Sequence, residues 1–131
     1  MHEKHIENLL NMSAQERVDY FVRRCAEVGV VWGLVVGEDN WVIFKGPDGE
    51  EVFPLWPHEA LAERCMFEEH RKMGAAPQAI AMASFLNRCI PDMAEQNVAF
   101  GVFFDLGQQA LTLPADTLKG LLQSEIALLS D

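Results

Sequence analysis

Hydrophobic residues recur at helical spacing in several parts of the chain, and the segment after Ser13 is the clearest case. Ser13 and Glu16 have the spacing of a capping box, in which each side chain accepts a hydrogen bond from the other residue's backbone N–H. Gly29 is a suitable helix stop, because glycine readily takes the left-handed conformation at a C-terminus. We therefore predict a helix between Ser13 and Gly29. Its apolar stripe contains Val18, Phe21, Val22, Cys25 and Val28, and the arginines of this segment are expected to lie outside that stripe.

Weaker stripes predict further helices elsewhere. Proline favours the first turn of a helix and disrupts a helix interior, because it has no backbone N–H to donate. The stretch 68–79 combines charges with Gly74 and Pro77 and predicts a loop. The other helical segments that we expect are residues 2–12, a helix after Pro57, a region over 82–96 broken or kinked at Pro91, and a last helix after Pro114.

Apolar, β-branched runs predict the strands. Residues 30–36 (VVWGLVV) are almost wholly apolar, which is typical of a central strand buried on both faces. Turns at GEDN and GPDG lead to extended segments over 41–45 and 50–56, so these three strands are expected to form an antiparallel meander. Residues 98–104 and 110–113 predict a later strand pair. Pro54 places the third strand at an edge or ends it there.

The order of these elements indicates the fold class. Strands are grouped rather than alternating with helices, which predicts an α+β fold with an antiparallel-rich sheet covered by helices. The three-strand meander and the later strand pair are expected to share one sheet. The length suits a single domain over residues 13–131, preceded by an N-terminal helical extension over residues 1–12.

Composition and charge narrow the function classes. The chain has 131 residues, half of them hydrophobic, and a formal net charge of −10. This charge argues against non-specific binding of nucleic acid or anionic membranes and permits a basic partner. The three cysteines do not form a disulfide framework, and no apolar run approaches the roughly 20 residues of a membrane span. The N-terminus does not resemble a secretory signal, so we expect a cytoplasmic protein.

No motif in the sequence indicates a catalytic centre. Phosphate-binding loops and nucleophile elbows are absent. Cys65 lies seven residues from His58, which is roughly 10 Å along a helix and too far for a direct hydrogen bond. His2 and His5 are one helical turn apart but at a terminus that is expected to fray. We therefore expect no catalytic residues, no bound metal and no cofactor.

The densest signal is the stretch EEVFPLWPHEALAERC at residues 50–65. We interpret its bulky residues as a structural plug between the sheet and the next helix, with Pro54 and Pro57 ending the strand and starting the helix. The other interpretation is a binding site, because exposed tryptophans anchor ligands and partners. Its candidate residues are Trp41, Trp56, His58, Arg64 and Cys65.

The same stretch, with ERVDYFVRRCAEVGVVWGL before it, resembles a bacterial family, domain of unknown function 2750 (DUF2750). MASFLNRCIPDM and LPADTLKGLL resemble the later parts of the family pattern, so the resemblance covers about residues 13–129. The chain differs by its longer N-terminal lead. The resemblance implies a compact α+β domain in bacteria and supplies no activity. It rests chiefly on Val31, Trp32, Gly33, Leu34, Val52, Phe53, Pro54, Leu55, Trp56, Pro57, Ala62 and Cys65.

Two functions remain open from the sequence. The first is a non-enzymatic protein-interaction module, adaptor-like or immunity-like, which binds an unknown protein partner, for which the acidic charge permits a basic protein, or forms a homodimer. The second is a small-ligand-binding protein or enzyme with its site near Trp56 and Cys65. The absence of a coherent catalytic set favours the first, so we lean against an enzyme.

Overall fold

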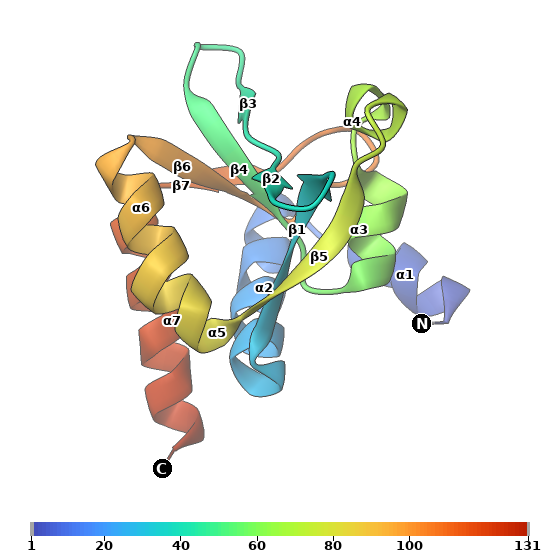
Figure 1. Ribbon diagram of the computed structural model, residues 1–131. Helices are drawn as coiled ribbons and strands as arrows, with labels where there is room; N and C mark the ends of the chain where they lie inside the picture. Colours follow the sequence, from blue (N-terminus) through green and yellow to red (C-terminus); the bar gives the residue numbers. More distant parts are fainter. Residues whose placement is uncertain (1, 131) are drawn as a thin grey trace.

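The computed structural model describes residues 2–130 and has an α+β fold, as predicted (Figure 1). Met1 and Asp131, the outermost residues of the predicted extension and domain, lie outside the described residues. The elements are α1 (Glu3–Leu10), α2 (Ala14–Val28), β1 (Val30–Val36), β2 (Asn40–Trp41), β3 (Phe44–Lys45), β4 (Glu51–Leu55), α3 (Glu59–Cys65), α4 (Glu68–Lys72), β5 (Ala76–Ala81), α5 (Met82–Ser84), a π-helical turn η1 (Phe85–Cys89), α6 (Ile90–Glu95), β6 (Val98–Val102), β7 (Leu111–Leu113) and α7 (Ala115–Leu129).

The strands form two sheets, so the expectation of one shared sheet is wrong. The first sheet has the order β2-β1-β5 and the second β3-β4-β6-β7. The segment after the GEDN turn leaves the first sheet after Trp41, which pairs with Val35, and joins the second at Phe44, which pairs with Val52. Trp32 and Trp56 connect the sheets through a pair of backbone hydrogen bonds of 2.8 and 3.0 Å.

Strand β4 pairs in parallel with β6 over Glu51–Leu55. The predicted meander contains only antiparallel pairs, so this pairing was not expected. The long connection through α3 to α6 makes this parallel pairing possible, because a parallel pair needs a crossover. On its other side β4 pairs with β3 only as far as Val52. The expected edge position is therefore wrong, since β4 lies between β3 and β6 and continues to Leu55, and Pro54 is accommodated where the side of β4 facing β3 is no longer paired.

The loop predicted over residues 68–79 is also wrong. The structure has helix α4 there, followed by β5, which pairs antiparallel with β1 from Val30 to Val35. The weak strand propensity of this stretch is overridden by tertiary pairing with the apolar strand β1. Pro77 is tolerated because β5 is an edge strand of its sheet.

Helix signals in the sequence are confirmed at several ends. Ser13 and Glu16 form the predicted capping box, and Gly29 ends α2 with a φ of 86°. Pro91 does not end its helical run, because the preceding π turn accommodates it. In that turn the N–H of Ile90 donates to the carbonyl of Phe85, five residues back, which widens the backbone before the proline ring.

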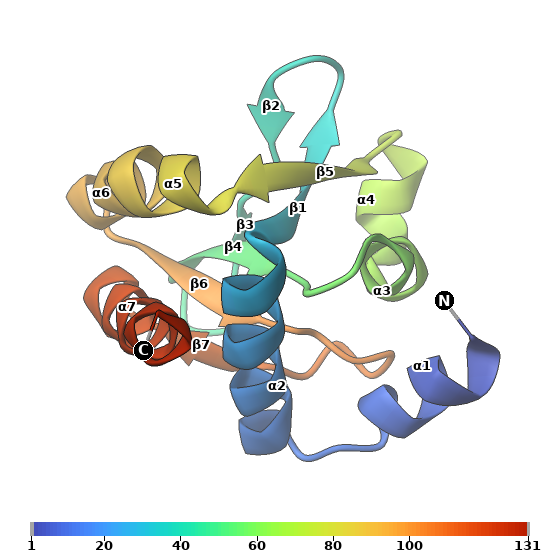
Figure 2. The same cartoon turned by 90° about the horizontal axis from the view of Figure 1, so that it is seen from below.

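The core lies between the sheets and the long helices. Helices α2, α6 and α7 contact β6, and Figure 2 shows them grouped on one side of the second sheet. Phe53 and Phe100 face this side, since Phe100 packs edge-on against Phe85 at 5.4 Å. Alternation along the strands places Val52 and Gly101 on the opposite face. No helix among residues 2–130 is long and apolar enough to span a bilayer.

Candidate functional site

The five predicted binding residues do not form one cluster. Trp56 is 1% exposed and donates from Nε1 to the carbonyl of Phe104, so it plugs the core as the structural interpretation required. Cys65 is also buried, and burial raises the pKa of its thiol to about 11. The other three have separate neighbours: Trp41 packs on Phe53, His58 contacts Tyr20, and Arg64 forms a bidentate pair with Glu3.

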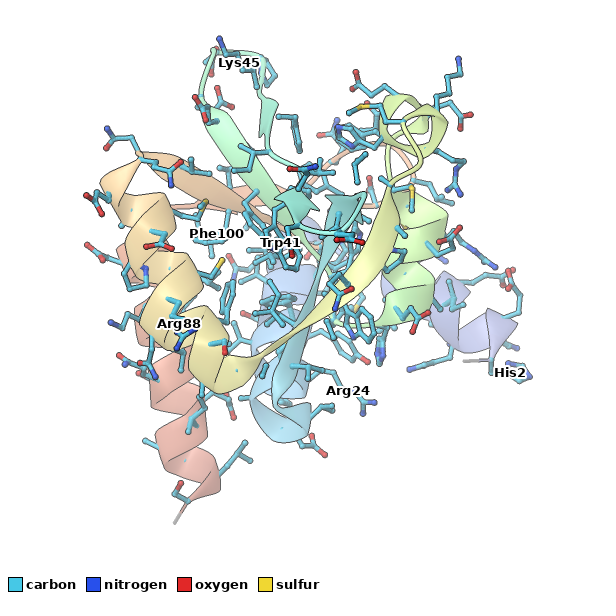
Figure 3. All side chains as sticks on the ribbon, viewed as in Figure 1. His2, Arg24, Trp41, Lys45, Arg88 and Phe100 are labelled. Atoms are coloured by element: carbon cyan, nitrogen blue, oxygen red, sulfur yellow. The ribbon has the colours of Figure 1, made fainter. Side chains whose placement is uncertain are left out.

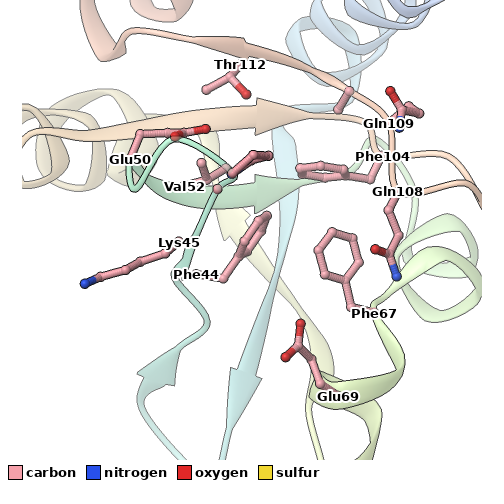
Figure 4. Close-up of a pocket in the computed structure, with 13 residues that line it drawn as sticks. Phe44, Lys45, Glu50, Val52, Phe67, Glu69, Phe104, Gln108, Gln109 and Thr112 are labelled. Atoms are coloured by element: carbon pink, nitrogen blue, oxygen red, sulfur yellow. The ribbon is translucent and has the colours of Figure 1, made fainter.

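A groove lies on the face of the second sheet opposite helices α2, α6 and α7. We call it the phenylalanine groove, because the rings of Phe44, Phe67 and Phe104 meet there with centroids 4.9 to 5.6 Å apart. Its volume is about 530 Å³, within the usual range of ligand pockets. Figure 4 shows the three rings facing one another. The remaining lining residues are Lys45, Gly46, Pro47, Glu50, Val52, Glu69, Gln108, Gln109, Ala110 and Thr112.

Small residues on the sheet make room for these rings. A side chain at Gly101 would overlap the ring of Phe104 and the methyl groups of Val52. The backbone just before Phe104 is left-handed, with a φ of 63° at Phe103, which is rare for a bulky residue. This turn sends the two consecutive rings apart. Phe103 packs beside Tyr20, whereas Phe104 lies over Gly101 in the groove.

Arg17 holds the loop that forms one wall of the groove. Its side chain is buried and donates from Nε to Phe103 and from Nη2 to Gln109, both backbone carbonyls, at 2.9 Å each. Nη1 donates to the carbonyl of Met12 at 2.8 Å. Asp105 lies 3.7 Å from the guanidinium and accepts from the N–H groups of Gly107 and Gln109. The loop over residues 103–109 is therefore fixed by a buried charge rather than by secondary structure.

The groove has a mixed rim. Lys45 extends away from the three rings, whereas the carboxylate of Glu69 points towards them (Figure 4). Glu50 accepts a hydrogen bond from the N–H of Asp48 and thereby closes the turn that follows β3. His70 is buried against the floor and stacks on Phe67 with an interplanar angle of 8°, and burial lowers the pKa of its imidazole. The groove thus combines an aromatic floor with two carboxylates at its edge.

A second polar cluster joins α1, α2 and the start of α3. The Tyr20 hydroxyl lies 2.6 Å from Nε2 of His58, and the His5 ring is 6.5 Å from the His58 ring. Burial, with Arg24 and His5 nearby, lowers the pKa of His58 to about 4. His58 is therefore neutral at pH 7, and its tautomer decides whether the Tyr20 hydroxyl or Nε2 donates in this hydrogen bond. The unfolded imidazole takes up a proton below its ordinary pKa of 6.5, so the stability of the fold decreases as the pH falls from 6.5 towards 4.

The groove lining and the three thiols show which reactive side chains the described residues place here. The groove lining contains neither cysteine nor histidine nor serine, and its polar side chains are those of Lys45, Glu50, Glu69, Gln108, Gln109 and Thr112. All three thiols have raised pKa values because of burial, which keeps them protonated at neutral pH. Within residues 2–130 no three His, Cys, Asp or Glu side chains are placed to share a metal ion.

Sequence reasoning missed the residues that build this groove. Arg17 was placed off the apolar stripe of α2, yet its spacing of four and eight residues from Phe21 and Cys25 puts it on the buried side. That spacing could have identified it. Phe44, Phe67 and Phe104 come from three separate segments, and no local pattern connects them.

Comparison with known proteins identifies the family. No curated protein and no solved structure matches the chain. A family model described as "Protein of unknown function (DUF2750)" matches residues 18–122, which include β1 to β7 and all groove residues but leave out α1. The chain therefore belongs to the DUF2750 family.

Proposed function

We propose that the protein is a non-enzymatic interaction module of the bacterial cytoplasm, adaptor-like or immunity-like, whose phenylalanine groove receives a segment of a partner protein. The single observation that carries this proposal is the groove itself, an aromatic hollow on the sheet face opposite helices α2, α6 and α7. Aromatic pockets with a polar rim are the usual anchoring points of protein interfaces.

The occupant is an extended segment with one large apolar side chain. Phe44 is half-buried, and Phe67 and Phe104 are 9% and 6% exposed, so their packed rings present a small apolar surface to such a side chain. A volume of about 530 Å³ accommodates an anchor together with its flanking backbone. The amide side chains of Gln108 and Gln109 are exposed at the rim, where they can donate to and accept from a peptide backbone.

The charges at the groove favour a partner segment that is basic. Glu50 and Glu69 line the groove, and the single basic lining residue, Lys45, extends away from its rings. The whole chain carries a formal net charge of −10, which speeds encounter with a positive partner. A Lys or Arg beside the apolar anchor would meet these carboxylates.

Photo-crosslinking from inside the groove tests the proposal. Benzoylphenylalanine replaces Thr112, an exposed groove residue, and in the matched control it replaces Thr117, which is exposed on α7. We expect one protein to be captured from cells through position 112 and not through 117. The purified partner should lose at least tenfold affinity for Thr112→Arg and retain it for Thr117→Arg.

The affinity for the purified partner should also depend on salt. Affinity should fall as ionic strength rises, because exposed charge pairs are screened within about 10 Å at 0.1 M salt. Equal capture through both positions, or capture of a second copy of the chain alone through position 112, would contradict the proposal. A partner whose contact segment is acidic would contradict the charge argument.

A further inference from the structure

A second cavity lies between β2 and the helical run Met82–Glu95, with Phe53 of β4 in its wall. We call it the Trp41 pocket. Its volume is about 230 Å³, below the roughly 300–1,000 Å³ of drug-sized sites, so any occupant is small. Figure 3 shows Arg88 on this helical run beside the strands that carry Trp41 and Phe100. The pocket is lined by Trp41, Phe53, Ile80, Ser84, Arg88, Cys89, Asp92 and Met93.

The apolar side of the Trp41 pocket is formed by two aromatic rings that lie against the glycine of strand β1. Trp41 is 37% exposed, and its ring lies 5.7 Å from that of Phe53. A Cβ atom on Gly33 would lie 3.0 Å from Cζ3 of Trp41 and 3.1 Å from Phe53, so the glycine allows both rings to approach the strand. This explains a glycine inside an otherwise bulky strand. Ile80 and Met93 complete an apolar surface that suits an aliphatic or aromatic side chain.

The polar side of the pocket carries two opposite charges. Arg88 and Asp92 are four residues apart on the helical run, which puts them about one turn apart. Within residues 2–130 neither side chain has an oppositely charged group within 4.0 Å, although this spacing commonly produces an ion pair. Both charges are therefore available to a ligand. Ser84 adds a hydroxyl one turn before Arg88.

A ligand that pairs with both Arg88 and Asp92 and also fills the apolar side of the pocket needs two adjacent opposite charges and an apolar side chain. We propose that the Trp41 pocket binds a free α-amino acid with an apolar side chain. The carboxylate pairs with the guanidinium of Arg88, whose planar fork suits two parallel hydrogen bonds. The ammonium group donates to Asp92, and the side chain packs against Trp41 and Met93. Cys89 takes no covalent part, because burial and Asp92 raise the pKa of its thiol to about 12.

Titration with defined small molecules tests this site. L-leucine and L-phenylalanine are added to the full chain, with binding followed by calorimetry and by tryptophan fluorescence, to which Trp32, Trp41 and Trp56 all contribute. The comparison compounds are 4-methylpentanoate, which lacks the ammonium group, and isopentylamine, which lacks the carboxylate. We expect dissociation constants below about 1 mM for the amino acids and at least tenfold weaker binding for both comparison compounds.

Matched variants locate the site. Arg88→Gln and Asp92→Asn should each weaken leucine binding at least tenfold, whereas Arg23→Gln and Asp19→Asn, both exposed on α2, should not change it. Thr112→Arg should also leave it unchanged, which separates this site from the phenylalanine groove. The proposal is overturned if no compound gives a saturable signal up to 10 mM, if either comparison compound binds as well as leucine, or if Arg88→Gln behaves like Arg23→Gln.

Discussion

Replacing Arg17 with methionine should both destabilise the protein and loosen the groove. The guanidinium makes three hydrogen bonds of 2.8 to 2.9 Å to backbone carbonyls, and the side chain is 4% exposed. Hydrogen bonds to a charged group contribute roughly 1.5–3 kcal/mol each. Removing the buried cation also returns several kcal/mol of desolvation energy. We therefore expect a net loss of about 3 kcal/mol, since the Phe103 carbonyl is left buried without a donor.

Urea denaturation measures this loss, and Arg23→Met is the matched control because Arg23 is exposed on the same helix. Hydrogen exchange gives a second, local readout. The amides of Gly107 and Gln109, which donate to Asp105, should exchange faster in the Arg17 variant than in the control. A loss within about 1 kcal/mol of the control, or unchanged exchange in this loop, would refute the role of Arg17 as its anchor.

Three further outcomes are expected. Trp56→Ala should cost about 3–5 kcal/mol in urea denaturation, and a loss below about 1 kcal/mol would contradict its burial. Between pH 6.5 and 4 the wild type should lose about 1–2 kcal/mol more stability than His58→Gln, because the unfolded imidazole takes up a proton first and solvent partly screens the partly exposed ring. Parallel stability curves for the two proteins would refute this. Gly101→Ala should cost about 1–3 kcal/mol and weaken partner binding by displacing Phe104, whereas Gly120→Ala, which meets nothing within 4 Å, should cost little.

Local signals predicted their own elements well. The capping box at Ser13, the C-terminal glycine at Gly29 and the GPDG turn, closed by a 3.0 Å hydrogen bond from Gly49 to Gly46, are all present. Each depends on residues within a few positions of one another, so the sequence contains the whole interaction. The α+β class follows from the same local patterns, because the grouping of strands is visible along the chain.

The candidate site could not be predicted in the same way. The groove rings belong to Phe44, Phe67 and Phe104, whose segments are dozens of residues apart in the chain. The tertiary structure, including the pairing of β4 with β6, brings them together. The binding-site interpretation was based on the tryptophans, yet Trp56 is the largest of the fully buried side chains. Aromatic residues serve cores and interfaces equally well, so their identity alone does not decide which one they join.

The sequence by itself determined where α2 begins and ends, that strands are grouped, and that the chain carries a net charge of −10. Tertiary structure alone decided the division into two sheets, the conversion of residues 76–81 into a strand, and the burial of Arg17. The physical reason is the range of the interactions. Caps and turns are satisfied by near neighbours, whereas strand pairing and a buried charge depend on partners such as Phe103, 86 residues from Arg17.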